Sequence, residues 1–325
     1  MQHLLVINTG GTIGMKPSES GLVPDPDFLE QHCHHAYFKN RPTLQVTWHE
    51  WAPLIDSSQI HPDQWNQIAQ LIADNAASHD GVLIIHGTDT LAYTSSALSF
   101  MLRGLSLPIV ITGAMRSIQE PDSDGPDNLD LAIHTCLKSG MTGVWVCFHH
   151  KIMPGSHISK MHASAADAFV SPLPDKRTHY EPNVPHRIAW ILPEQCGIDV
   201  FTYYPGCPLD ALATMVTNDN RALVLRSFGS GNLPETGEFT HYLRTAMAAN
   251  KTVVNISQCF VSQVDMARYQ VGGHLVELGV ISAFTMTFEA VITKLMIILS
   301  HSQNHEEIAA QFSEEWTLEM PLYEG

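Results

Sequence analysis

The chain is poor in basic residues. Its 325 residues include 17 lysines and arginines against 33 aspartates and glutamates, which gives a formal net charge of −16. Nucleic acids and anionic membranes are bound mainly through clusters of lysine and arginine. The charge balance therefore disfavours both as partners, and it fits a small neutral or zwitterionic ligand.

Dense cysteine patterns and long apolar runs are also missing. The six cysteines show no CxxC pair, so we expect free thiols in a reducing compartment rather than a disulfide framework. The apolar stretch 290–299 is interrupted by Lys294 and is too short to span a bilayer. The first strand-like segment begins at about His3, which leaves no room for a signal peptide, so we expect a cytoplasmic protein.

The glycine and serine signatures of several enzyme classes are absent as well. The sequence has no complete GxGxxG pattern, no P-loop GxxxxGK[ST] and no GxSxG elbow. Nineteen histidines are many, but the groups at 32–35 and 149–150 lack the paired spacing of a zinc site. We therefore predict neither a metal ion nor a cofactor, and we place these histidines in surface loops.

What the chain does contain is a pair of threonine motifs, TGGTIG at Thr9–Gly14 and HGTDT at His86–Thr90. Each follows a short apolar run, 4–7 and 82–85, that is typical of a buried strand. In an open parallel sheet, the residues between a strand and the next helix lie at the carboxyl edge, where such sheets bind ligands. The two motifs therefore predict one site built from two loops.

Strand-like and helix-like segments alternate along the chain. In the first half, predicted strands are 4–8, 44–50, 82–85, 109–112 and 144–148, and predicted helices are 62–78, 94–103 and 128–139. In the second half, predicted strands lie near 198–203, 222–227 and 252–256, and predicted helices near 209–217, 238–249 and 287–300. Such alternation indicates parallel sheets covered by helices on both faces.

These patterns predict an α/β protein with two domains. The larger is an amino-terminal parallel-sheet domain of flavodoxin or Rossmann type over 1–180, and the smaller is a carboxy-terminal α/β domain over 197–325. The stretch between them is rich in proline and charge, so 181–196 is predicted to be a linker.

The residues around the motifs decide whether the threonines are reactive, because a threonine hydroxyl is a weak nucleophile until a neighbouring group takes its proton. Thr12 follows two glycines that let a ligand approach closely, although a glycine turn alone is equally typical of phosphate binding. Thr88 and Asp89 precede a predicted helix, where they fit either a reactive site or an ordinary helix cap. Lys160 fits either an ion pair with Asp89 in a closed site or a surface lysine.

A third loop carries Asp56, Ser57 and Ser58 after the second predicted strand. Their polar groups suit a grip on the ends of a small polar ligand. Taken alone, however, Asp-Ser-Ser is an ordinary turn.

Together the two threonine motifs resemble the signatures of the bacterial-type L-asparaginase family. Supporting matches run along nearly the whole chain and include 56–58, 92–102, 112–114, 123–125, 128–129, 167–169, 225–232, 258–259, 289–290 and 293–295. The pattern is most similar to the cytoplasmic type I enzymes of that family.

The resemblance implies hydrolysis of L-asparagine to L-aspartate and ammonia without a cofactor. It makes Thr12 the nucleophile of an acyl-enzyme intermediate that water then opens. Thr88, Asp89 and Lys160 would activate the nucleophile or the water and move a proton to the leaving ammonia. The residues implied to hold the substrate's α-amino and α-carboxylate groups are Asp56, Ser57, Ser58, Thr88 and Asp89.

The same resemblance implies an assembly and a second site. Family members form homodimers or dimers of dimers, in which the neighbour's carboxy-terminal domain closes each active site. Some type I enzymes also bind asparagine at an allosteric site, and the matching positions are Ser159, Arg226, Gly231, Asn232 and Cys259. Arginine suits bidentate binding of a carboxylate. A core strand that ends in a glycine turn explains residues 222–232 nearly as well.

Two segments depart from the family pattern. Leu22 stands where many relatives carry a tyrosine in the mobile loop after the first motif, so that tyrosine's role would fall to another group, such as Tyr269. Residues 151–157 precede Lys160 where relatives often have an Arg-Gly-Asn-Arg-like segment, which leaves the conformation of this loop open.

Two other functions are compatible with the same core. An amide-hydrolysing subunit of a tRNA-dependent amidotransferase would need an added amino-terminal domain, whereas this chain is acidic and starts at the first strand. A non-catalytic amide sensor would keep the pocket, which suits Leu22 but not the intact Thr12 and Lys160. Release of ammonia from asparagine separates an enzyme from a sensor.

Overall fold

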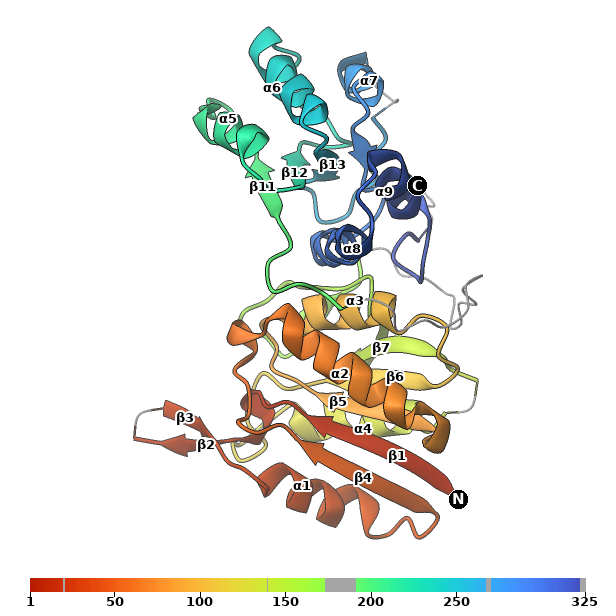
Figure 1. The fold of residues 1–325 in the computed structure, drawn as a ribbon. Helices are drawn as coiled ribbons and strands as arrows, with labels where there is room; N and C mark the ends of the chain where they lie inside the picture. The colour runs from red at the N-terminus through yellow and green to blue at the C-terminus, as the bar shows by residue number, and fades with distance from the viewer. Residues whose placement is uncertain (20, 139, 173–190, 267–269, 322–325) are drawn as a thin grey trace.

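The computed structural model describes residues 1–19, 21–138, 140–172, 191–266 and 270–321. It contains two sheets of mainly parallel strands, with the carboxy-terminal sheet above the amino-terminal one in Figure 1. The predicted two-domain α/β fold is confirmed. The boundaries at 180 and 197 stay predictions, because 173–190, including most of the predicted linker 181–196, lie outside the described residues.

The amino-terminal sheet has six strands in the order β4-β1-β5-β6-β7-β8, and all but the last run parallel. Their bounds are β4 Leu44–Glu50, β1 Gln2–Asn8, β5 Gly81–Ile85, β6 Pro108–Thr112, β7 Gly143–Phe148 and β8 Lys151–Pro154. The five strands predicted in this half are confirmed, and the antiparallel β8 is an addition. Because β1 lies between β4 and β5, the strand order reverses there, and open α/β sheets bind ligands at such a point.

Helices cover both faces of this sheet, as predicted. Each buried strand sends alternate side chains to opposite faces, so in β1 Leu5 and Ile7 belong to one core and Leu4 and Val6 to the other. The first face carries α2 (Pro62–Asn75) and α3 (Leu91–Met101), and the second carries α1 (Phe28–Cys33) and α4 (Gly125–Cys136) (Figure 1).

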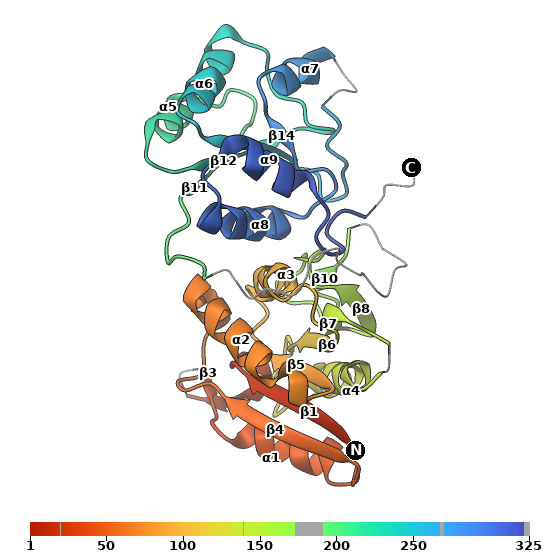
Figure 2. The ribbon, with the colours of Figure 1, turned by 45° about the vertical axis from the view of Figure 1, so that its right-hand side comes forward.

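The carboxy-terminal sheet has four parallel strands in the order β11-β12-β13-β14. Its strands are β11 Ile198–Thr202, β12 Ala222–Ser227, β13 Thr252–Ser257 and β14 Ile281–Ser282, and its helices are α5 Asp210–Thr217, α6 Gly237–Ala248, α7 Gln270–Glu277, α8 Phe288–His301 and α9 His305–Ser313. The helix α8 lies between this sheet and α3 of the other domain (Figure 2). One hydrophobic core therefore runs through both domains and fixes how they dock.

Several smaller elements were not predicted. Two short antiparallel hairpins occur, β2 (Met15–Ser18) with β3 (Gly21–Pro24) and β9 (Ser159–Lys160) with β10 (Phe169–Val170). The β2–β3 hairpin projects from the body of the protein in Figure 1. All six cysteines are free thiols. Among the described residues, no helix is long and apolar enough to cross a membrane.

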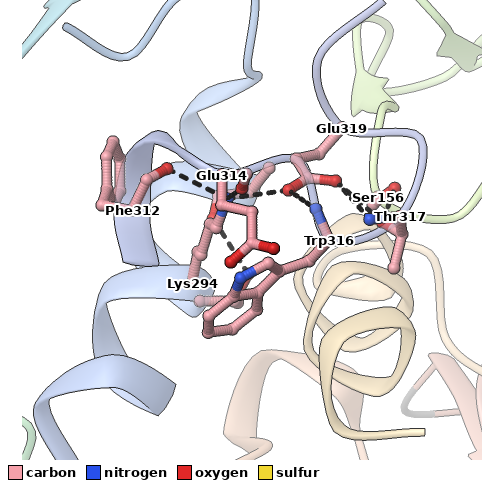
Figure 3. A network of polar contacts seen from close by, with 9 residues as sticks. Ser156, Lys294, Phe312, Glu314, Trp316, Thr317 and Glu319 are labelled. Atoms are coloured by element: carbon pink, nitrogen blue, oxygen red, sulfur yellow. Dashed lines mark hydrogen bonds and ion pairs between the residues drawn. The ribbon is translucent and has the colours of Figure 1, made fainter. Parts of the chain in front are cut away.

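A buried ion pair anchors the end of the described chain (Figure 3). Lys294 of α8 and Glu319 are both fully buried, and the Lys294 Nζ lies 2.8 Å from Glu319 Oε1 and 3.0 Å from the carbonyl oxygen of Phe312. The backbone N–H groups of Trp316 and Thr317 also donate to the Glu319 carboxylate, each at 2.8 Å. Burial acts to raise the pKa of Glu319, but the ammonium and these donors together lower it below its usual value.

This anchored segment docks on the amino-terminal domain. The Thr317 hydroxyl donates to the Ser156 hydroxyl oxygen at 2.8 Å (Figure 3). The Trp316 ring packs edge-on against Phe100 of α3, and the guanidinium of Arg103 lies 3.9 Å from the centre of the same ring. The carboxy-terminal segment therefore adds polar contacts to the shared core between the domains.

We expect Glu319→Gln to destabilise the protein by about 3–5 kcal/mol, because the Lys294 ammonium would stay buried without its counter-charge. Urea denaturation at pH 7 measures the loss. Glu235→Gln, in an exposed loop, is the matched control and should change the free energy of unfolding by less than about 0.5 kcal/mol. Adding Lys294→Met to Glu319→Gln should recover part of the loss, and no recovery would contradict the account of an unpaired charge.

Candidate active site

The loops that follow β4, β1 and β5 meet at one point on the carboxyl edge of the large sheet. A Cβ atom on Gly11 would lie 2.6 Å from the Cα of Gly87, and one on Gly87 would lie 2.5 Å from the hydroxyl oxygen of Ser57. Only glycine allows such approaches, and Gly11 also has a φ of 103°. Thr12 and Thr88 each follow one of the touching glycines, so the structure brings them to the same place.

Hydrogen bonds hold the same junction together. The Thr9 N–H and the Thr9 hydroxyl both donate to the carbonyl oxygen of Ile85, each at 2.9 Å. The Ile55 N–H donates to the carbonyl oxygen of Thr9 at 2.7 Å. These bonds tie the strand ends of β1 and β5 to the loop after β4, which is a third contributor beside the two threonine motifs.

The first motif places Thr12 at the start of a single 3-10 turn, Thr12–Gly14. Ile13 is fully buried beneath this turn, and its carbonyl oxygen accepts the N–H of Ile118 at 3.0 Å. The Ser117 hydroxyl donates to the carbonyl oxygen of Met15 directly after the turn. The backbone on both sides of Thr12 is therefore held, while the Thr12 side chain is half-buried at the edge of the site.

The second motif is joined to Lys160. The Lys160 Nζ lies 2.9 Å from the Thr88 hydroxyl oxygen and 2.7 Å from Asp89 Oδ1. An ammonium has donors only, so Thr88 accepts from it and points its own hydroxyl hydrogen elsewhere. The Lys160 side chain is 17% exposed and Asp89 62%, so this contact leaves the Asp89 carboxylate open to a ligand. Two hydrogen bonds from Lys160 therefore join these three side chains. Among the described residues, none is seen to bond with the Thr12 hydroxyl.

The loop after β4 packs against this group. Asp56 caps the short turn Ser57–Gln59, and its Oδ1 accepts the N–H and the hydroxyl of Ser58, both at 3.0 Å. The Ser57 hydroxyl oxygen accepts the Asp89 N–H at 3.3 Å, and the Ser57 carbonyl accepts the Thr90 hydroxyl at 2.7 Å. Ser57 thus contacts Asp89 and Thr90, with Asp56 and Ser58 next to it in the chain, and the binding role of these three residues stays a prediction.

His86, which is not among the predicted site residues, fixes the backbone of the junction. His86 is buried, and its Nδ1 lies 2.6 Å from the carbonyl oxygen of Gly87, which can only accept. Nδ1 therefore carries the hydrogen, and Nε2 accepts the Thr94 hydroxyl at 3.0 Å, which in turn accepts the Trp65 Nε1–H at 2.9 Å. Burial lowers the pKa of His86 to about 4, so the ring is neutral at pH 7. Its position inside the HGTDT motif is the sequence feature that could have identified it.

The structure places three of the five predicted allosteric residues around one cavity and the other two outside its lining. Ser159, Arg226 and Cys259 line one cavity of about 250 Å³ at the carboxyl ends of β12 and β13. Gly231 and Asn232 do not line it: they form the turn after β12, where Asn232 bridges back to Phe228. Assignment of these two residues to a ligand site stays a prediction.

The cavity also holds polar groups suited to a small ligand. Glu289 lines it, accepts the Ser159 hydroxyl at 2.7 Å, and has a pKa raised by burial. The Arg226 guanidinium lies 5.1 Å from the centre of the Phe288 ring, and its Nε is buried without a hydrogen-bond partner among the described residues. An anionic group entering the cavity would find a donor at Arg226.

Two further sequence-based suggestions concern metals and the loop after Thr12. Among the described ranges, no three histidine, cysteine or acidic side chains lie close enough to hold a metal ion. Leu22 lies on β3 and is exposed, so no tyrosine hydroxyl comes from that strand position. Tyr269, suggested as its replacement, lies outside the described residues.

Comparisons with known proteins give a consistent result over the whole chain. The family model described as Asparaginase, N-terminal, matches residues 3–182, and the Glutaminase/Asparaginase C-terminal domain matches 197–312. The chain is 37% identical over 327 residues to L-asparaginase 1 of Escherichia coli (strain K12), covering 96% of each chain. Among solved structures, L-asparaginase I from Vibrio cholerae matches with a TM-score of 0.89 and 33% identity over 99% of each chain. The thermostable L-asparaginase from Thermococcus kodakarensis matches with a TM-score of 0.86 and 32% identity, over 99% of this chain and 100% of that one.

The buried neutral His86 predicts a specific pH dependence of stability. Its pKa is about 4 in the folded protein against 6.5 in the unfolded chain, so the unfolded state binds the extra proton between these values. Stability therefore falls as the pH drops from 6.5 to 4, by up to about 3 kcal/mol from this residue. We expect His86→Asn, which cannot titrate, to show a shallower loss in urea denaturation between pH 7 and pH 4. His134→Asn, at an exposed site on α4, should keep the wild-type slope, and equal slopes for all three proteins would contradict the assignment.

Proposed function

The chain belongs to the asparaginase family, and we propose that it hydrolyses L-asparagine to L-aspartate and ammonia. The observation that carries the proposal is the Lys160 ammonium bound to both Thr88 and Asp89, beside the glycine contact that brings Thr12 to the same edge. A surface lysine or an ordinary helix cap would not need this arrangement. The intact constellation also favours an enzyme over a non-catalytic sensor.

We propose Thr12 as the nucleophile. Its oxygen attacks the side-chain amide carbon, the carbon–nitrogen bond breaks, and an ester forms between Thr12 and the aspartyl group. The proton that Thr12 loses balances the one that the departing amine gains as ammonia. Water then attacks the ester, releases aspartate and returns a proton to the Thr12 oxygen.

Thr88, Asp89 and Lys160 are proposed to move these protons. Lys160 donates to the Thr88 oxygen, which leaves the Thr88 hydroxyl hydrogen free to be given to a reacting group. The Asp89 carboxylate stabilises the ammonium that supplies this hydrogen bond. The three side chains therefore form a short route along which a proton passes without rearrangement of the backbone.

The substrate's charged ends fit the loops around the glycine junction. A carboxylate such as Asp89, largely exposed and next to Ser57, suits the α-ammonium group of an amino acid. The Ser57 hydroxyl and the backbone N–H groups near the start of α3 suit its α-carboxylate. We assign this binding role to Asp56, Ser57, Ser58, Thr88 and Asp89.

We expect the protein to release ammonia from L-asparagine with a higher specificity constant than from L-glutamine. We also expect Thr12→Ala to lower kcat by at least about a thousand-fold, because the attacking oxygen is lost. Coupled ammonia detection measures both rates. Thr12→Ser keeps a hydroxyl and should retain measurable turnover. This variant separates loss of the attacking hydroxyl from a change in side-chain shape.

Equal specificity constants for the two amides would contradict the proposed substrate. Near-normal turnover by Thr12→Ala would remove Thr12 from the nucleophile role. The melting temperature of each variant is measured beside the assay. It should stay nearly unchanged, because Thr12 is only half-buried.

The cavity at Ser159, Arg226 and Cys259 supports a proposed regulatory site for asparagine. The Arg226 guanidinium suits the ligand's carboxylate, and Ser159 is the residue before Lys160, so a bound ligand would affect the active site.

We also propose a homodimer or dimer of dimers, in keeping with exposed apolar side chains at Phe228, Val261 and Phe284. Six free cysteines fit a cytoplasmic location.

A regulatory site makes the shape of the rate curve a prediction. Initial rates of the wild-type protein against L-asparagine should be sigmoidal. Arg226→Met should give a hyperbolic curve with a similar maximal rate, because it removes the carboxylate donor and keeps the aliphatic stem. Arg244→Met, on the exposed face of α6, should stay sigmoidal. A hyperbolic wild-type curve would contradict regulation by the substrate.

A further inference from the structure

The segment that carries Lys160 leaves the large sheet at Gly155. The Gly155 N–H donates to the carbonyl oxygen of Val144 at 2.9 Å, and the Gly155 carbonyl accepts the Ser95 hydroxyl at 2.7 Å. Beyond this point, Lys160 lies in the two-residue strand β9, whose partner among the described strands is the equally short β10. A two-stranded pair is marginally stable by itself.

The anchor at Gly155 does not suffice to place the Lys160 ammonium. Five residues of extended chain span up to about 17 Å, which leaves Lys160 ample freedom around that anchor. A group that handles protons has to be held within about 0.5 Å of its productive position. Other contacts must therefore fix the chain between these two residues.

His157 makes such a contact with the other domain. The side chain is fully buried, and its Nε2 lies 3.0 Å from the carbonyl oxygen of Thr285, in the loop before α8. A carbonyl only accepts, so Nε2 carries the hydrogen, and Nδ1 lies 3.0 Å from the hydroxyl oxygen of Ser171. Thr285 is itself fixed, because its hydroxyl donates to the carbonyl oxygen of Pro321 at 2.9 Å.

Ser156 and Ser159, which lie close to His157 in the chain, also contact the carboxy-terminal domain. The Ser156 hydroxyl oxygen accepts the Thr317 hydroxyl, in the segment anchored by Glu319 (Figure 3). The Ser159 hydroxyl donates to Glu289 of α8. These two contacts join hydroxyls that rotate freely, whereas the His157 imidazole is a rigid ring and is fully buried.

We propose that His157 is a positioning residue, whose hydrogen bond to Thr285 sets the place of Lys160 by fastening strand β9 to the carboxy-terminal domain. The inference rests on the proposed role of Lys160 in proton transfer. It makes the docking of the two domains a condition for an ordered active site, even though Thr12, Thr88, Asp89 and Lys160 all belong to the amino-terminal domain.

The experiment compares three variants that remove different parts of the imidazole. His157→Gln can place an N–H near the position of Nε2 and keep the bond to Thr285. His157→Asn can keep a polar atom near Nδ1 but does not reach Thr285, and Ser171→Ala removes the partner of Nδ1 alone. We expect kcat for L-asparagine to fall at least about tenfold in His157→Asn, with KM changed less than about threefold, because one bond that orders a proton-transfer group is lost. His157→Gln and Ser171→Ala should stay within about threefold of wild type.

Hydrogen exchange gives a readout that does not need turnover. The Met161 N–H donates to the carbonyl oxygen of Ala168 at 2.8 Å, directly after Lys160. Its protection, and that of β9 and β10, should drop in His157→Asn and persist in His157→Gln, while the protection of the six-stranded sheet is unchanged. A uniform loss over the whole protein would indicate a merely structural role and overturn the proposal.

The two readouts separate failure of this inference from failure of the proposed function. If the wild-type protein released no ammonia while exchange at Met161 followed the expected order, the reaction would be wrong and the fastening by His157 would stand. Unchanged exchange in His157→Asn, or equal kcat in His157→Asn and His157→Gln, would overturn the positioning role whatever the activity.

Discussion

The backbone contact between Gly11 and Gly87 is the constraint on which the site depends. Neither position admits a Cβ atom, so two strand ends approach until their main chains touch, with Ser57 closing the third side. The residues that follow the two glycines are the threonines. The neutral His86 ring donates a hydrogen bond to the Gly87 carbonyl, and the strand order places the junction where an open sheet binds ligands.

The second requirement is a partner for these threonines, and it comes from outside the large sheet. Lys160 reaches Thr88 and Asp89 from a two-residue strand, and the segment before it contacts the carboxy-terminal domain through His157. That domain is held in turn by the shared core of α3 and α8 and by the buried Lys294–Glu319 pair. The stability of the domain contact and the order of the proposed proton route are therefore linked.

The sequence predicts well what depends on local pattern. Apolar runs such as 82–85 locate the parallel strands, and the strand–glycine–threonine order locates the site at their carboxyl ends. It does not predict contacts made across long separations: the bond of His157 to Thr285, or the ion pair that joins Lys294 to Glu319, has no local signature. Glycine is equally ambiguous in the sequence alone, since Gly11 meets the main chain of Gly87 in the site, whereas Gly231 packs against side chains such as Val264 in the turn after β12.

In the proposed reaction, the glycine junction brings Thr12 into place as the attacking hydroxyl of a two-threonine site. The most direct measurement is rapid acid quenching during turnover of L-asparagine, followed by protease digestion and mass spectrometry of the trapped peptides. We expect an added aspartyl group on the peptide containing Thr12, and fragmentation should place it on that residue. An aspartyl group on Thr88 instead, or asparagine turnover through an adduct on any other residue, would contradict it.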